Sequence, residues 1–433
     1  MKQPLKFCMV TTFYPPYSFG GDAMYIYRLA NQLATSGHQV DVVHCEDAYS
    51  VLSKRVPSGD FPNHENVKLY RLKSWAGALS PLGTQQTGTA VFKRAKLKAI
   101  LENNSYDVIH YHNMSLIGIT SLSYGSGVKL YTTHEHWLLC PMHVLWKYDS
   151  EVCTTKSCIK CTIHGGRPPQ LWRYTSLMKR MLSHVDCFIS PSRFTLQKHV
   201  DAGLDILIKH IPYFLPRPPQ PWPEKHEADL PRENVERPSF LFVGRLEKIK
   251  GLQNLIPVFK GLSSFDLYVA GTGEYEPELK RLAEGSANIK FLGNLSQDQL
   301  RGLYKEAVAV IVPSICYETF GIIIIEAFSM KTPVIVNRLG ALPEVVQDSG
   351  GGLIYENQDQ LRSSIEMLAN DRALRNDLGE KGFAAYNRFW NEDAHLDQYL
   401  TLIENLKSSR IAKAERAPSF DAGQVALSSS SSQ

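Results

Sequence analysis

Short apolar runs, each followed by turn residues and an amphipathic segment, recur along both halves of this chain of 433 residues. Runs of roughly four to eight apolar residues bounded by turn signals are typical of strands that are buried on both faces. The repeated strand–turn–helix order predicts an α/β fold in which each half forms its own doubly wound, parallel sheet. The expected strands lie at 7–12, 39–44, 67–72, 107–112, 128–133, 187–190 and 206–213 in the first half, and at 240–243, 267–270, 289–292, 308–312, 333–336 and 352–354 in the second.

A proline-rich segment separates the two halves. Eight prolines fall between residues 212 and 238, with few apolar residues among them, which is typical of an interdomain linker. From Ser408 onward, alanine, serine and charged residues dominate the sequence. We therefore expect an N-terminal domain at 1–213 with a cysteine-rich loop at 140–164, a linker at 214–238, a C-terminal domain at 239–390, a C-terminal helix at 391–410 that packs back on the N-terminal domain, and a disordered tail at 411–433.

The composition is that of an ordinary globular protein, with 43% hydrophobic and 21% charged residues. The net charge of +4 is too small to predict nucleic acid as a partner. No apolar run approaches the roughly 20 residues of a membrane-spanning helix, and the first residues show no signal-peptide core. We expect a cytoplasmic protein, in which the eight cysteines are thiols or metal ligands rather than disulfides.

Two glutamates eight residues apart, Glu318 and Glu326, lie at the junction between the strand at 308–312 and an expected helix at 322–330. Junctions at the carboxyl ends of parallel strands are where open α/β sheets bind ligands. Four consecutive isoleucines indicate that the helix is largely buried, and a buried carboxylate requires a partner. The pair is therefore either a ligand-binding site, with acid/base chemistry as one option, or a capped helix with an incidental second glutamate.

Gly20 and Gly21 lie between the first strand and an expected helix at 23–36. They offer bare backbone amides to an anion, although a flexible turn explains the pair equally well. The full G-x-G-x-x-G fingerprint of dinucleotide-binding proteins is not met. In the second half, Arg245 and Lys250 follow a buried strand, where their cations would stand at its carboxyl end.

His134 and His136 follow the strand at 128–133. The two histidines could form a metal pair. A single histidine that faces a cleft and donates one hydrogen bond to a ligand requires fewer assumptions.

Two expected helices combine cations with apolar or aromatic residues, at 91–101 and at 171–182. Such helices are compatible with peripheral contact with an anionic membrane surface, here the inner surface of the membrane. A basic helix face that is simply solvated is the commoner explanation for the first, and a helix packed on its own domain explains the second equally well.

Four of the eight cysteines fall in one loop, in the pattern C-x12-C-x4-C-x2-C: Cys140, Cys153, Cys158 and Cys161. Four thiolates suit a closed tetrahedral zinc site, and a long loop gains order from such a site. Structural zinc is the first interpretation, reduced cysteines the second, and a disulfide or an iron–sulfur centre the third. A catalytic metal is disfavoured because four thiolates leave no open coordination position.

Several motifs of this chain occur in the order in which the retaining family 4 glycosyltransferases have them, so the chain resembles that family. Its members have the GT-B architecture, in which two Rossmann-like domains face each other across a cleft. The resemblance spans about residues 6–400, and the cysteine-bearing loop is similar to a subgroup of that family. The motifs are Gly20-Gly21, His134, Gly244-Arg245-Leu246 with Lys250-Gly251, Gly271-Thr272-Gly273, Glu318-x-Phe320-Gly321 through Glu326-Ala327, Pro333-Val334-Ile335, and Gly340 with Glu344.

The resemblance implies roles that elementary chemistry supports. A nucleotide-sugar donor leaves as a nucleoside diphosphate, so negative charge develops on its phosphates. Arg245 and Lys250, with the amides of Gly20 and Gly21, would stabilise that charge without a metal. Glu326 would accept hydrogen bonds from the ribose hydroxyls of the donor.

Other residues would contact the sugar. Glu318 would accept a hydrogen bond from a sugar hydroxyl, and His134 would contact the sugar from the opposite domain. The backbone amides of Phe320, Gly321 and Ile322 would cover the sugar and the distal phosphate at a helix N-terminus. The implied reaction is front-face substitution with retention, which requires no side-chain nucleophile and no catalytic cofactor. The implied acceptor is a saccharide, a glycolipid or another lipid-linked polysaccharide intermediate.

Two departures from the family pattern bear on this interpretation. Lys331 stands where the family usually has glycine after the helix, which puts a left-handed cap there in doubt. Ala341 replaces the second glycine of a usual pair before Glu344. Alternative functions are a nucleotide-sugar epimerase or phosphorylase of the same fold, and a non-catalytic sugar-nucleotide-binding protein.

Overall fold

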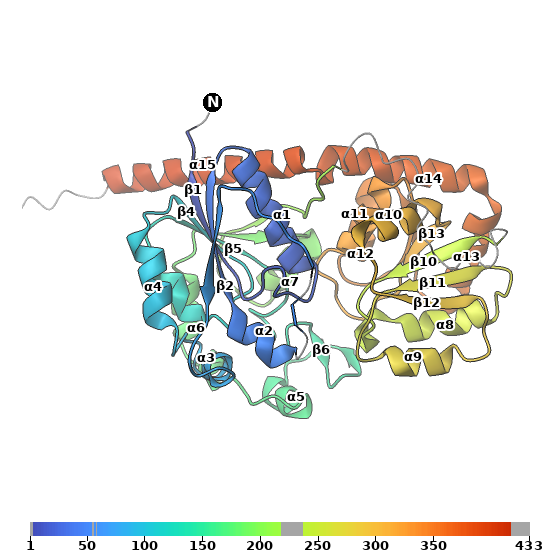
Figure 1. The fold of residues 1–433 in the computed structure, drawn as a ribbon, viewed down its shortest axis with the longest axis horizontal. Helices are drawn as coiled ribbons and strands as arrows, with labels where there is room; N and C mark the ends of the chain where they lie inside the picture. Colours follow the sequence, from blue (N-terminus) through green and yellow to red (C-terminus); the bar gives the residue numbers. More distant parts are fainter. Residues whose placement is uncertain (1–2, 54–55, 58, 218–236, 417–433) are drawn as a thin grey trace, which may run out of the picture.

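The computed structural model describes residues 3–53, 56–57, 59–217 and 237–416, which form two α/β units, each built on a parallel sheet (Figure 1). In this part of the chain the N-terminal sheet has seven strands in the order β3-β2-β1-β4-β5-β8-β9. Its elements are β1 (Lys6–Val10), α1 (Gly21–Thr35), β2 (Gln39–Cys45), α2 (Glu46–Leu52), β3 (Val67–Leu72), α3 (Leu79–Thr87), α4 (Arg94–Asn103), β4 (Val108–Tyr111), η1 (Ile119–Ser123), β5 (Val128–Thr132), β6 (Trp146–Lys147), β7 (Glu151–Val152), α5 (Cys158–His164), η2 (Leu171–Tyr174), α6 (Leu177–Leu182), β8 (Cys187–Ser190), α7 (Arg193–Asp201) and β9 (Ile208–His210).

The C-terminal sheet has six described strands in the order β12-β11-β10-β13-β14-β15, again all parallel. The strand orders reverse direction at β1/β4 and at β10/β13, as expected for doubly wound sheets. The elements of this half are β10 (Ser239–Val243), η3 (Lys248–Lys250), α8 (Leu252–Lys260), β11 (Asp266–Ala270), α9 (Glu276–Leu282), β12 (Ile289–Gly293), α10 (Gln297–Glu306), β13 (Ala309–Val312), α11 (Ile322–Ser329), β14 (Val334–Asn337), α12 (Leu342–Ser349), β15 (Gly352–Tyr355), α13 (Gln358–Asn370), α14 (Arg372–Ala385), the π-helix η4 (Tyr386–Trp390) and α15 (Glu392–Arg416).

Helices cover both faces of each sheet, so the alternate side chains of every central strand are buried. In the N-terminal unit, α1 and α15 cover one face, whereas α4, η1, η2 and α6 cover the other. The core on the α1 side continues across the junction between the two units through Tyr213, Phe320 and Trp390. The predicted α/β fold with two parallel, Rossmann-like sheets is confirmed.

The last helix, α15, returns to the N-terminal unit and lies along its upper side (Figure 1). Tyr399 hydrogen-bonds His110 inside the N-terminal sheet. Lys407 bonds Asp107 at 2.8 Å, and Arg410 bonds Asp186 through two nitrogens. The helix continues to Arg416 and so enters the stretch that was predicted to be a disordered tail; residues 417–433 lie outside the described part of the chain, as do 218–236 of the predicted linker.

One local prediction is wrong, and one open question is answered. The helix expected at 171–182 is divided into η2 and α6, because the hydroxyl of Thr175 donates to the Trp172 carbonyl and accepts from the Leu177 amide. Lys331 does adopt the left-handed conformation, with φ 60°. Its ammonium group lies 2.7 Å from Glu380 and over the ring of Phe383, contacts that help to hold the residue in this costly conformation.

No helix in the described part of the chain is long and apolar enough to span a membrane.

Candidate functional site

The loops that leave the carboxyl ends of the two sheets contact each other across the junction between the units. The Thr319 hydroxyl, before α11, donates to the carbonyl of His134, after β5, at 3.0 Å. The Thr195 hydroxyl on α7 donates to the Thr319 carbonyl at 3.2 Å. Because ligands of open α/β sheets bind at these strand ends, the junction is the candidate site.

Two helix N-termini meet in this junction. Gly20 is extended and precedes α1, whose first residue is Gly21. Gly321 has φ 94° and precedes α11, whose first residue is Ile322. A Cβ atom on Gly21 would lie 3.4 Å from the Cγ2 of Ile322, so the helix ends almost touch. Unpaired amides and the positive ends of two helix dipoles therefore face the same space, an arrangement that favours an anion.

Lys250 and Glu318 form the central ion pair of the site, with Nζ 2.7 Å from Oε1. The Ser314 hydroxyl donates to the same oxygen at 2.7 Å. Burial opposes the charge of Glu318, but Lys250 and the two hydrogen bonds outweigh it and hold the pKa of the carboxyl below its usual value. Burial likewise opposes the charge of Lys250, but Glu318 raises the pKa of the ammonium above its usual value. Both groups are thus charged at neutral pH.

Arg245 lies at the end of β10, with its side chain half exposed and paired with Glu247. Its charge adds to that of Lys250 in holding the pKa of Glu318 below its usual value. Close backbone packing fixes the loop that carries both cations. Gly251 has φ 76°, and a Cβ atom there would lie only 1.9 Å from the carbonyl oxygen of Pro313. Only glycine fits this position.

Glu326 lies on α11 and already has two protein partners. The Tyr304 hydroxyl donates to Oε2 at 2.9 Å. Arg28, on α1 of the opposite unit, places its Nη2 3.5 Å from Oε1. The sequence predicted that this carboxylate would require a partner, but it identified neither Arg28 nor Tyr304. No local pattern links these residues, because each partner lies on a different helix.

His134 is buried and uses both ring nitrogens within the protein. Nε2 lies 2.8 Å from Nδ1 of His112, and Nδ1 lies 2.6 Å from the hydroxyl of Tyr213. Burial lowers the pKa of His134 to about 4, so the ring is neutral. A sugar could therefore bond this ring only by replacing one of those partners. His136 points elsewhere, toward His199, and does not pair with His134.

The four loop cysteines border one small cavity of about 10 Å³. Burial raises the pKa of Cys140, although the backbone amides of Leu145 and Met142 hydrogen-bond its sulfur. Among the described residues, no group of three or more cysteine, histidine or acidic side chains is arranged to hold a metal ion. The thiols are thus gathered but do not form a ligand set here, and structural zinc stays a prediction.

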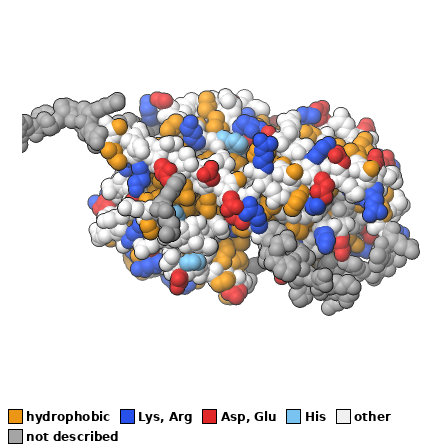
Figure 2. Space-filling view, turned by 90° about the horizontal axis from the view of Figure 1, so that it is seen from above, with side chains coloured by type: hydrophobic (Ala, Val, Ile, Leu, Met, Phe, Trp, Pro, Cys, Tyr) orange, Lys and Arg blue, Asp and Glu red, His pale blue; other side chains and the backbone are white. Residues whose placement is uncertain are grey.

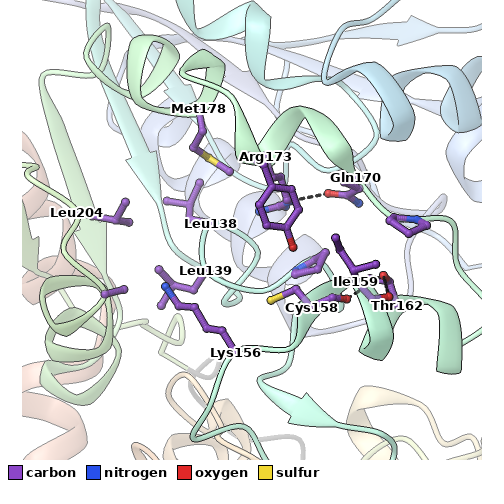
Figure 3. A pocket seen from close by; sticks show the side chains of 14 residues that line it. Leu138, Leu139, Lys156, Cys158, Ile159, Thr162, Gln170, Arg173, Met178 and Leu204 are labelled. Carbon is purple, nitrogen blue, oxygen red and sulfur yellow. Dashed lines mark hydrogen bonds between the residues drawn. The ribbon is translucent and has the colours of Figure 1, made fainter.

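The cysteine loop also reaches the C-terminal unit and borders a larger cavity. Lys248 lies 3.2 Å from the carboxylate of Asp149, in the turn between β6 and β7. The larger cavity, of about 320 Å³, lies between the cysteine loop and the segment that contains η2 (Figure 3). Its lining is largely apolar, with Arg173 bonded to Gln170 at one side and Lys156 at another.

A carboxylate of the C-terminal unit caps a helix of the N-terminal unit. Glu344 on α12 accepts the backbone amides of Arg193 and Phe194, the first residues of α7, at 2.8 and 2.9 Å. The Arg193 guanidinium also bonds both oxygens of Asp348. The sequence motif contained Glu344, but nothing in the sequence linked it to α7.

Two family models match successive parts of the chain. The model of glycosyltransferase family 4 matches residues 19–214, and that of glycosyl transferases group 1 matches residues 225–384. A glycosyltransferase of Methanocaldococcus jannaschii, described as uncharacterized, is 27% identical over 396 residues, which are 86% of this chain and 90% of the relative. The chain is a glycosyltransferase with the GT-B fold.

Two further comparisons bear on this glycosyltransferase. The lipopolysaccharide core biosynthesis glycosyltransferase LpsE of Rhizobium meliloti is 27% identical over 225 residues, 51% of this chain and 64% of the relative. The structure of HepE from Anabaena, solved in complex with UDP-glucose, superposes with a TM-score of 0.63 at 16% identity. That superposition covers 94% of this chain and 100% of HepE, and it supports the fold.

Proposed function

We propose that this glycosyltransferase transfers a sugar, with retention, from a nucleoside-diphosphate sugar to a saccharide or lipid-linked acceptor. The observation that carries the proposal is the meeting of two helix N-termini, at Gly21 and Ile322, beside Lys250 and Arg245. Amides, helix dipoles and two cations in one place suit a diphosphate. The solved complex of HepE with UDP-glucose supports a nucleotide-sugar donor, and the similarity to LpsE supports a glycan acceptor.

Glu318 is suited to hold the transferred sugar. Lys250 and Ser314 both contact its Oε1. Oε2 has no hydrogen-bond partner among the described residues and is free to accept one from a sugar hydroxyl. Lys250, already oriented by Glu318, would direct its remaining protons toward the distal phosphate, and the amides of Phe320, Gly321 and Ile322 would lie beside it.

Glu326 would accept from the ribose hydroxyls through Oε1. The distance of 3.5 Å to Arg28 is longer than a hydrogen bond, so a ribose hydroxyl competes there with a weak contact. Donor binding would thereby loosen one link between the two units. His134 would act on the sugar only after exchanging its bond to Tyr213.

In the proposed reaction, the bond between the anomeric carbon and the phosphate oxygen breaks, and the acceptor oxygen bonds the same face of that carbon. The departing phosphate oxygen takes the acceptor proton. The cations and amides stabilise the developing diphosphate charge. No side-chain nucleophile and no metal are needed in this scheme.

The test combines binding with turnover. Screening a panel of nucleotide sugars by thermal shift should identify the donor, and NMR of the product should show a retained anomeric configuration. Glu326→Gln should lose donor affinity about tenfold or more, whereas Glu318→Gln should mainly lower kcat. Glu284→Gln, on the surface of the same unit, is the control. Unchanged kinetics in both variants would refute the assignment, and donor consumption without any acceptor would favour an epimerase.

A further inference from the structure

Two stretches of the N-terminal unit contain no acidic residue, although the whole chain nearly balances 47 basic with 43 acidic residues. Between Glu65 and Glu102, the first stretch has seven lysines and arginines. Between Glu151 and Asp186, the second has six. Charge this one-sided over two separate segments indicates an anionic partner if the segments meet in the fold.

They do meet. The Trp172 indole donates to the Gln85 carbonyl at 2.9 Å, and the Gln86 amide donates to the Pro168 carbonyl at 3.4 Å. The last helix within each stretch, α4 in the first and α6 in the second, packs on η1. The two segments therefore form one layer over the sheet face opposite α15, on the lower and outer side of the unit in Figure 1.

The cations of this layer are largely available. Lys93 is buried against Asp47, Arg71 and Lys98 have acidic neighbours, and Arg173 is enclosed by two tryptophan rings. The other nine are exposed and form no ion pair with any described residue: Lys68, Lys73, Arg94, Lys96, Lys156, Lys160, Arg167, Lys179 and Arg180. By contrast, the face that carries α15 mixes acidic and basic side chains (Figure 2).

Large apolar side chains are exposed in the same layer. Trp75 is 89% exposed and meets the ring of Phe92 at 5.6 Å. Leu171 and Tyr174, on η2, are 65% and 63% exposed. Of the sixteen large hydrophobic side chains that are exposed among the described residues, nine belong to the two segments: Trp75, Leu79, Leu82, Val91, Phe92, Ile159, Ile163, Leu171 and Tyr174. We call this surface the basic–aromatic layer.

We propose that the basic–aromatic layer docks on an anionic lipid bilayer. Cations interspersed with exposed aromatic and aliphatic side chains match a surface of anionic head groups above acyl chains. A second copy of the chain would oppose cation to cation and is disfavoured.

The cavity in Figure 3 strengthens the choice of lipid. It is lined by the exposed side chains of Ile159 and Tyr174, and thus lies in this layer. Its walls combine Leu138 and Met178 with the cations Lys156 and Arg173. Nη2 of Arg173 is buried without a hydrogen-bond partner among the described residues. An apolar cavity with cations at its side suits the chain and phosphate of one lipid.

The experiment is co-sedimentation of the full chain with vesicles of phosphatidylglycerol and phosphatidylcholine, compared with phosphatidylcholine alone. Binding should be at least tenfold stronger to the anionic vesicles and should weaken strongly in 0.5 M salt. The variant Lys160→Gln/Arg167→Gln/Lys179→Gln should bind about a hundredfold more weakly. Trp75→Ser/Leu171→Ser should bind about tenfold more weakly and keep the salt dependence.

Changes of the same kind on the C-terminal unit are the controls. The first control, Lys305→Gln/Arg372→Gln, removes two exposed cations, and the second, Met367→Ser, removes an exposed apolar side chain. Both lie far along the chain from the layer and should leave vesicle binding unchanged. Three results would overturn the proposal. The first is wild-type protein that binds anionic vesicles no better than neutral ones, and the second is control variants that lose as much vesicle binding as the layer variants. The third is light scattering that shows a dimer of the wild-type protein and a monomer of the layer variants. Donor binding, measured on the same samples, separates failure of this proposal from failure of the proposed reaction.

Discussion

His395 makes the stability of the N-terminal unit depend on pH in a way that one substitution can isolate. This buried residue of α15 places Nδ1 2.8 Å from the Pro212 carbonyl and Nε2 3.0 Å from the Tyr25 hydroxyl. Since a carbonyl can only accept, Nδ1 carries the proton and Nε2 accepts from Tyr25. A second proton, on Nε2, would point at the Tyr25 hydroxyl and break the hydrogen bond that Nε2 accepts from it. It would also place a positive charge in the buried core, which disfavours charge.

The magnitude follows from the pKa. Burial lowers the pKa of His395 from 6.5 to about 4. Between these values the unfolded chain binds a proton that the folded chain does not, so stability falls as the pH drops below about 6.5 and stops falling near 4. At pH 5.5, one unit below the ordinary value, the loss is about 1.4 kcal/mol; the full loss across the window is about 3 kcal/mol.

The assay is urea unfolding at pH 7.5 and pH 5.5, followed by circular dichroism. His395→Gln removes the titrating group, so it should be less stable than wild type at pH 7.5 but should lose about 1.4 kcal/mol less on acidification. The other buried histidines are present in both proteins, so most of their contribution to the pH dependence cancels in the difference; His110 is the exception, because burial and then His134 and His395 lower its pKa. The control is His164→Gln, at an exposed position of α5. Its free energy of unfolding should fall between pH 7.5 and pH 5.5 by as much as that of wild type. Equal pH dependence of His395→Gln and wild type would refute the reasoning.

Three further perturbations test the architecture. Glu344→Ala removes the carboxylate that caps α7 across the junction, so small-angle scattering should show a larger radius of gyration. Loss of the cap should lower the free energy of unfolding by about 1 kcal/mol. An unchanged radius would mean that other contacts hold the units together. Gly251→Ala should lower stability by at least about 2 kcal/mol in thermal unfolding, because its Cβ would overlap the Pro313 carbonyl at a positive φ, whereas Gly302→Ala, with open space around it, should not. Elemental analysis of protein purified without oxygen tests the predicted zinc of the cysteine loop, and a content far below one equivalent would reject it.

Local pattern was sufficient to predict most of the secondary structure. The strands at 67–72 and 187–190 have the predicted bounds, and most of the others differ by one or two residues. Apolar runs bounded by turn residues predict such strands because a strand buried on both faces has few other compositions available. The same reasoning failed at Thr175, whose hydroxyl bonds the backbone on both sides and interrupts the expected helix.

What the sequence alone determined was the order of the strand–turn–helix units and the residue types at their carboxyl ends, since both follow from contacts between near neighbours in the chain. Only the tertiary structure decided which of those residues meet. Arg28 reaches Glu326 from the other unit, Glu344 caps α7, and two acid-free segments join into one layer. Such pairings join residues far apart in the chain, and charge, periodicity and turn chemistry carry no information about them until the sheets are packed.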